Sequence, residues 1–234
     1  MAVYVDDIIL TGSDDQGIHA AQTFLQSHFL CRDMGRPRYF LGIEFAYRPQ
    51  EVSLSQRKYV LDLLQETGQL GCKPESTPVE LNPPYWDTSA PLLDDPTSYR
   101  RLVGKLIYLT VTRPDISFAV GLLSQFMHEP RIVQWQGAMR VLAYIKGAPG
   151  KGLLYRRHGH LEVSSYSDSG YAGDRGDRKS TSGYCTYVGG NLVTWRSKKQ
   201  NVVSRSSAEA EYRAMAQAAS EMMWIKSFLM TLGF

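Results

Sequence analysis

The chain has 234 residues, of which 43% are hydrophobic and 21% are charged, and its 26 basic and 23 acidic residues give a net charge of +3. This composition excludes an intrinsically disordered chain and allows one large domain or two modest ones. The charge excess is too small to indicate a nucleic-acid partner by itself, so such a partner must be argued from local clusters.

Sequence patterns also argue against secretion and against a membrane span. No apolar run approaches the roughly 18 residues that cross a membrane, and the first residues include acids where a signal peptide has bases. The cysteines, Cys31, Cys72 and Cys185, are odd in number and have no metal-binding spacing. We therefore expect an intracellular protein with reduced thiols and no membrane partner.

The first predicted element is a β-hairpin. In MAVYVDDIIL, apolar residues that favour strand flank the adjacent acids Asp6 and Asp7. A tight turn that presents both carboxylates is the simplest local structure. Acidic turns are ordinary in proteins, so the rest of the chain must decide whether this one has a function.

Helices and a proline-rich segment are predicted for the middle of the chain. A helix led by Asp14 and a strand pair over residues 39–54 come first, followed by a helix that Ser55 caps. Six of the eleven prolines lie in residues 73–96, which predicts a linker or a wrapped extended arm. Two or three helices are then expected between residues 97 and 150, over the segments 98–112, 116–128 and 132–147.

From Gly152 onward the pattern changes to short alternating segments that predict strands, and a long helix capped by Ser206 or Ser207 follows. The chain is therefore predicted to be α+β or α/β. Its abrupt ends lead us to expect a segment of a longer protein. The predicted units are residues 1–72, 73–96, 97–150 and 151–234.

Carboxylates at a strand end and at a helix start suggest a metal site in the last unit. Asp168 ends the first predicted strand there, and Glu209 and Glu211 lie in the first turns of the final helix. Magnesium prefers such hard oxygen ligands, and phosphodiester chemistry commonly uses a pair of metal ions. The two glutamates point in nearly opposite directions, so at most one of them faces Asp168. The alternative is that these acids are solvated and complement the helix dipole.

Basic and aromatic residues cluster in the same unit and are candidates for binding a nucleic-acid backbone. Their common feature is a position in the loop before the second strand or near the end of the third. A solvated charged loop is the alternative interpretation. The candidates are Arg178, Lys179, Trp195, Arg196, Lys198 and Lys199, together with Ser180, which could donate a hydrogen bond to a phosphate or could equally start a strand.

Seven motifs along the chain resemble a known family when they are taken together and in order. They are YVDDIILTGSD, YFLGIEF, LSQRKYVLDLL, CKPESTPVE, YRRLVGKLIYLTVTRPDISFAV, DRKSTSGYC and TWRSKKQNVVSRSSAEAEYRA. This set resembles the reverse transcriptase and ribonuclease H part of copia-type retrotransposon Pol polyproteins, over essentially the whole chain. In length and end points the chain is also similar to truncated plant reading frames, including mitochondrial ones.

The resemblance implies a fold and a set of site residues. Residues 1–72 would be the end of the polymerase palm and the start of its thumb, residues 97–150 the helical thumb and connection, and residues 151–234 an incomplete ribonuclease H-like domain. The implied partners are a primer–template or RNA–DNA hybrid and the remainder of the polyprotein, with Mg²⁺ as cofactor. The implied catalytic and metal-binding residues are Asp6, Asp7, Asp168 and Glu211, the last preferred over Glu209 because Ala214 and Ala218 follow it at the family's spacing.

The departures from the family pattern leave two hypotheses open. A polymerase of this kind needs a further aspartate upstream of YVDD, and ribonuclease H needs two more acids after the final helix. The first hypothesis is a polyprotein segment that takes part in RNA-directed DNA synthesis and hybrid cleavage. The second is an inactive remnant that at most binds nucleic acid. By family the protein would be nuclear or cytoplasmic, and a mitochondrial location stays open.

Overall fold

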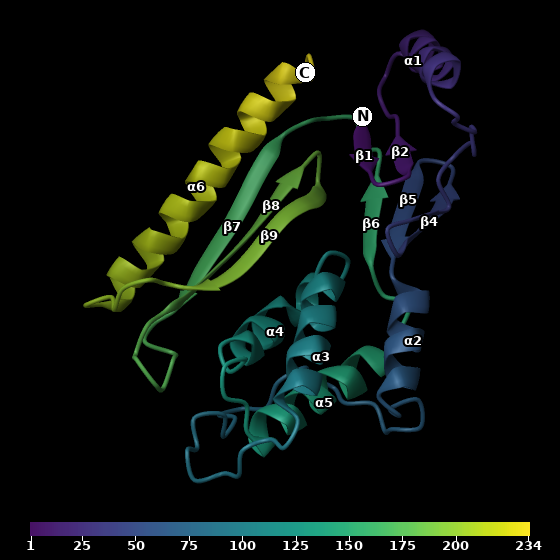
Figure 1. The fold of residues 1–234 in the computed structure, drawn as a ribbon. Helices are drawn as coiled ribbons and strands as arrows, with labels where there is room; N and C mark the ends of the chain where they lie inside the picture. Colours follow the sequence, from purple (N-terminus) through teal and green to yellow (C-terminus); the bar gives the residue numbers. More distant parts are fainter.

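The computed structural model describes all 234 residues and has a mixed α/β architecture, which confirms the predicted fold class at that level. Three sheets and six α-helices are arranged as an N-terminal hairpin, a four-stranded sheet, a helical unit and a three-stranded sheet covered by one long helix (Figure 1). None of the helices is long and apolar enough to cross a membrane.

The N-terminal hairpin and the helix after it lie on the surface. Strands β1 (Ala2–Tyr4) and β2 (Asp7–Ile9) pair antiparallel, as the sequence predicts. Helix α1 (Asp15–His28) begins after Asp14, whose carboxylate accepts a hydrogen bond from the Gly17 backbone N–H at 3.0 Å. No residue of α1 is buried, so this end of the chain adds little to the core.

A four-stranded antiparallel sheet joins segments that are far apart in the sequence. It contains β3 (Tyr39–Phe40), β4 (Ile43–Arg48), β5 (Glu51–Ser55) and β6 (Leu153–Arg156) in that order. The boundary predicted at residue 150 would assign β6 to the last unit, but β6 pairs with β5, with Leu153 opposite Leu54. Gly152 permits this pairing, because a Cβ there would overlap the carbonyl oxygen of Leu54.

The largest core lies among the helices of the middle unit. These are α2 (Arg57–Glu66), α3 (Pro96–Leu109), α4 (Ser117–Ser124) and α5 (Ile132–Lys146), with a 3₁₀ turn, η1 (Pro114–Ile116), before α4. A cluster of 17 buried hydrophobic residues fills the space between them. It includes Tyr85 of the proline-rich segment, which is therefore the wrapped arm rather than a loose linker. Helix α4 ends four residues before the predicted limit at residue 128.

The C-terminal unit is a sheet with a helix on one face (Figure 1). Strands β7 (Val163–Gly170), β8 (Thr181–Val188) and β9 (Asn191–Lys199) pair antiparallel in that order. Helix α6 (Ser207–Thr231) packs on β7 and β8 through the buried small residues Ala210, Ala214 and Ala218. Ser206 caps α6 by accepting a hydrogen bond from the Glu209 N–H, which confirms one of the two predicted caps.

Candidate functional site

The acids Asp6 and Asp7 are presented at the tip of the N-terminal hairpin. Tyr4 is opposite Asp7 in the β1–β2 register, so Val5 and Asp6 form the turn. Both carboxylates are exposed, and neither makes a side-chain hydrogen bond or ion pair. Val5 has a φ of 46°, which is unusual for a β-branched residue and marks a strained turn. The hairpin thus exposes to solvent two carboxylates that have no side-chain partner.

Asp168 lies on the face of β7 that is turned away from α6. Its neighbour Ser169 is buried and accepts a hydrogen bond from Gln200 Nε2, which also donates to the Ala210 carbonyl oxygen on α6. Successive strand residues point to opposite faces. The exposed Asp168 side chain therefore does not face the helix on which both candidate glutamates lie.

The two candidate glutamates of α6 have different surroundings. Glu209 accepts hydrogen bonds from the Arg205 backbone N–H at 2.8 Å and from Arg213 Nη2 at 2.8 Å. These contacts, led by the Arg205 N–H, lower the pKa of Glu209 below its ordinary value. Glu209 thus accepts the N–H of the residue before the cap Ser206, rather than that of Ser206 itself as in a capping box. Glu211 is half-buried and makes no side-chain hydrogen bond or ion pair.

The candidate acids do not come together as a metal centre in this chain. No group of three or more His, Cys, Asp or Glu side chains is placed to hold a metal ion. Asp6 and Asp7 offer at most two ligands at the hairpin, and Asp168 and Glu211 lie on elements whose acids do not face each other. Two carboxylates are fewer than a magnesium pair ordinarily needs. The arrangement by itself therefore does not fit a complete magnesium site.

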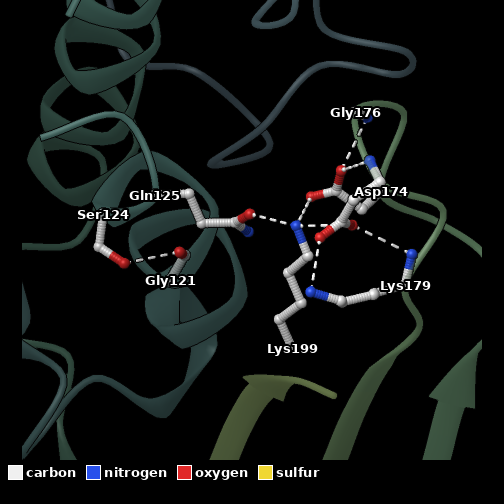
Figure 2. A network of polar contacts seen from close by, with 8 residues as sticks. Gly121, Ser124, Gln125, Asp174, Gly176, Lys179 and Lys199 are labelled. Carbon is white, nitrogen blue, oxygen red and sulfur yellow. Dashed lines mark hydrogen bonds and ion pairs between the residues drawn. The ribbon is translucent and has the colours of Figure 1, made fainter. Parts of the chain in front are cut away.

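Four of the seven predicted nucleic-acid-binding residues make side-chain contacts within the fold. Ser180 is fully buried and accepts a hydrogen bond from the Ala172 N–H. Trp195 Nε1 donates to the Thr110 carbonyl oxygen at the end of α3, at 3.1 Å. Lys179 of the β7–β8 loop and Lys199 at the end of β9 form ion pairs with acids of that loop (Figure 2). Only Arg178, Arg196 and Lys198 are exposed and form no ion pair.

Sequence reasoning missed two buried polar residues that organise this unit. Asp174 accepts hydrogen bonds from the backbone N–H groups of Gly176 and Asp177. Its pattern of Asp followed two residues later by Gly is a turn signal that could have identified it. Gln200 donates through Nε2 to Ser169, Ser182 and the Ala210 carbonyl oxygen, and no local pattern in the sequence indicates that role.

Comparisons with known proteins connect these features to a family. A family model described as reverse transcriptase (RNA-dependent DNA polymerase) matches residues 1–81. The whole chain is 46% identical to the retrovirus-related Pol polyprotein from transposon RE1 of Arabidopsis thaliana, of which it spans 16%. No solved structure matches the chain.

Two relatives are matched over most of their own length. An uncharacterized mitochondrial protein of Arabidopsis thaliana is 43% identical over 224 residues, which cover 96% of this chain and 93% of the relative. A putative transposon Ty5-1 protein of Saccharomyces cerevisiae is 32% identical, with 95% of this chain and 73% of the relative covered.

Proposed function

Because the chain belongs to the reverse transcriptase family found in retrotransposon Pol polyproteins, we propose that it takes part in RNA-directed DNA synthesis as one segment of such a polyprotein. The observation that carries the proposal is the hairpin that displays Asp6 and Asp7, within the residues that the family model matches. Residues 1–72 would be the palm end and thumb start, and residues 97–150 the rest of the thumb and the connection.

We further propose that the unit from residue 151 onward is ribonuclease H-like and acts on RNA–DNA hybrids. Its support is the order of three antiparallel strands and a helix, with Asp168 on the first strand and Glu211 in the first turns of the helix. The proposed site residues are accordingly Asp6, Asp7, Asp168 and Glu211. By family the polyprotein would reside in the nucleus or cytoplasm, and the mitochondrial relative makes the mitochondrion a third location.

Reverse transcriptases ordinarily use a divalent metal ion such as Mg²⁺, which supplies charge stabilisation at the transferring phosphate. The carboxylates of this chain do not form a site of three or more ligands. We therefore assign no catalytic step to the chain alone. Its acids would act with ligands that other parts of the polyprotein contribute.

A second candidate function is nucleic-acid binding without catalysis, as expected of an inactive remnant. The separation of Asp168 from the acids of α6 favours it. In both candidates the chain would contact a primer–template or hybrid through the predicted basic residues that are exposed and form no ion pair, Arg178, Arg196 and Lys198. Binding is therefore the property to test before catalysis.

We predict that the chain binds a fluorescent RNA–DNA hybrid and that its affinity falls with salt, because bound phosphates release counterions. The double variant Arg196→Ala/Lys198→Ala should weaken binding. It should also reduce the slope of log K against log salt by about 1 for each phosphate that the variant no longer neutralises. Fluorescence anisotropy over a salt series measures both quantities.

A matched control for this experiment is Lys226→Ala. Lys226 is an exposed lysine of α6 that forms no ion pair and lies outside the candidate set. The control should bind as the parent chain does. An equal loss of affinity in the control and in the double variant would show non-specific charge attraction and would contradict the proposed surface.

A further inference from the structure

Four polar side chains connect the end of β9 to α4, and we call this group the clasp: Lys199, Asp174, Asp177 and Gln125 (Figure 2). Lys199 Nζ lies 2.5 Å from Asp174 Oδ2 and 2.9 Å from Asp177 Oδ1. It also donates to Gln125 Oε1, just beyond the end of α4, at 3.0 Å. One ammonium group thus contacts two separate units of the fold.

The charged groups of the clasp have ionic and hydrogen-bond partners although they are partly buried. The Asp174 side chain is only 3% exposed, and its other oxygen accepts hydrogen bonds from two backbone N–H groups, those of Gly176 and Asp177. Burial alone would lower the pKa of Lys199, but its bonds to Asp174 and Asp177 outweigh that effect and raise the pKa above the ordinary value. The lysine therefore stays charged, and the buried carboxylate has a partner for its charge.

The loop that carries Asp174 is held from a second side by the proline-rich arm. Arg175 Nη2 donates to Asn82 Oδ1 at 2.7 Å. Gly176 lies against the Trp86 ring so closely that a Cβ there would be 3.0 Å from Trp86 Cδ1. Both arm residues belong to the segment that packs on the helical core, so the loop is fixed to that unit as well.

The end of β9 is also anchored on its opposite face. Gln200 follows Lys199 and points to the α6 side, where its Nε2 donates to the Ala210 carbonyl oxygen. Ser204 Oγ in turn donates to Gln200 Oε1 at 2.8 Å. Consecutive residues therefore attach this one point of the chain to α6 on one side and to α4 on the other.

We propose that Lys199 and Asp174 hold the sheet β7–β9 in a single orientation on the helical unit α2–α5. Units joined within one chain move relative to each other unless their interface prevents it. The clasp restrains this relative motion at the point where the end of β9 meets the end of α4. Its consequence for function rests on the proposed function above: a hybrid bound to the sheet would keep a fixed position relative to the helical unit.

The test measures the distance between the two units in the full chain without nucleic acid. Spin labels at Leu70→Cys and Met223→Cys, both exposed positions, report on the helical unit and on α6, in a background with the three native cysteines replaced by alanine. The parent chain should give one narrow distance distribution. Lys199→Met should broaden it by roughly twofold or more, because the contacts of the ammonium group with both units are lost.

Three further variants test whether the broadening in Lys199→Met comes from the loss of the clasp contacts. Lys198→Met removes the same charge from the adjacent residue, which forms no ion pair, and should leave the distribution narrow. Lys199→Arg keeps a cation and should restore most of the restraint. Gln125→Ala cuts only the contact to α4 and should broaden the distribution to a smaller extent, which keeps the test informative if Lys199→Met does not fold.

A narrow distribution in folded Lys199→Met and in Gln125→Ala, equal to that of the parent, would overturn the proposal. Equal broadening in Lys198→Met would also overturn it, because the effect would then follow from net charge. Neither outcome depends on hybrid binding. The failure of this inference is therefore distinguishable from the failure of the proposed function.

Discussion

Replacing Arg113 with methionine is expected to lower the free energy of unfolding by about 3 kcal/mol, because it breaks a buried ion pair from one side. The Arg113 side chain is 1% exposed, and its Nε and Nη2 donate to the two carboxylate oxygens of Asp115 at 2.9 Å each. Its Nη1 donates to the Ala148 carbonyl oxygen beyond α5, at 3.0 Å. Chemical denaturation of parent and variant measures the change.

The ion pair between Arg113 and Asp115 also predicts how the loss of stability in Arg113→Met depends on pH. Burial opposes ionisation of Asp115, but hydrogen bonds from Arg113, Tyr144 and Lys151 outweigh it and hold the pKa well below the ordinary 3.8. A carboxyl whose pKa is lower in the folded state stabilises the fold above its unfolded pKa, and this stabilisation disappears as the pH falls. The difference in stability between parent and Arg113→Met should therefore stay constant from about pH 7 down to about pH 5 and shrink as the pH falls further.

The matched control is Arg101→Ala. Arg101 is 65% exposed on α3 and lies 4.0 Å from Glu66, so its removal should cost less than about 1 kcal/mol. A destabilisation of Arg113→Met as small as in this control, or a difference that grows on acidification, would contradict the assignment of Arg113 as a buried support of the helical unit.

Two glycines in helices are expected to respond to alanine with opposite signs. A Cβ at Gly137 of α5 would overlap the Tyr85 hydroxyl and lie 2.7 Å from Tyr85 Cε1. Tyr85 is 4% exposed and packs edge-on against Phe126, so it has little room to move. Gly137→Ala should therefore lower the free energy of unfolding by about 2 kcal/mol through overpacking.

Gly104 of α3 provides the matched comparison. It is exposed, and a Cβ there would meet nothing within 4 Å. Gly104→Ala should raise the free energy of unfolding by about 0.5–1 kcal/mol, because alanine loses less backbone entropy than glycine when a helix forms. Thermal and denaturant unfolding of both variants measure the two changes. A neutral Gly137→Ala would mean that the arm does not pack on α5 through Tyr85, and a destabilised Gly104→Ala would mean that the surface of α3 is not open at that position.

Local patterns in the sequence predicted the elements whose ends are set by neighbouring residues. Ser206 caps α6 as predicted, because its own side chain satisfies a free N–H of the first turn. Ser55 was predicted to cap α2 and does not: it pairs with Glu44 in the β4–β5 register, and Gln56 occupies the cap position. The Glu44 carboxylate from β4 accepts the Lys58 N–H instead, at 2.6 Å. A tertiary cap of this kind has no signature in the helix sequence.

Contacts between residues that are far apart in the sequence explain most of the other differences between the predictions and the structure. Strand β6 joins β5 across about a hundred residues, which alternation alone does not reveal. Lys199 was predicted to bind phosphate because it lies in a basic stretch, but its partners Asp174 and Gln125 are distant in sequence. The resemblance identified the family, whereas the burial of Ser180 and the contact of Trp195 with α3 required the fold.

The central claim is that the chain binds an RNA–DNA hybrid but does not carry a complete catalytic site by itself. The most direct measurement is cleavage of a labelled hybrid by the purified chain in Mg²⁺ and in Mn²⁺, beside Asp168→Asn, with binding recorded in the same samples and folding checked by circular dichroism. We predict binding without cleavage in either metal, because the carboxylates are not gathered into one site. Cleavage by the parent chain that disappears in Asp168→Asn would contradict the claim and would show that the acids of this chain complete an active centre.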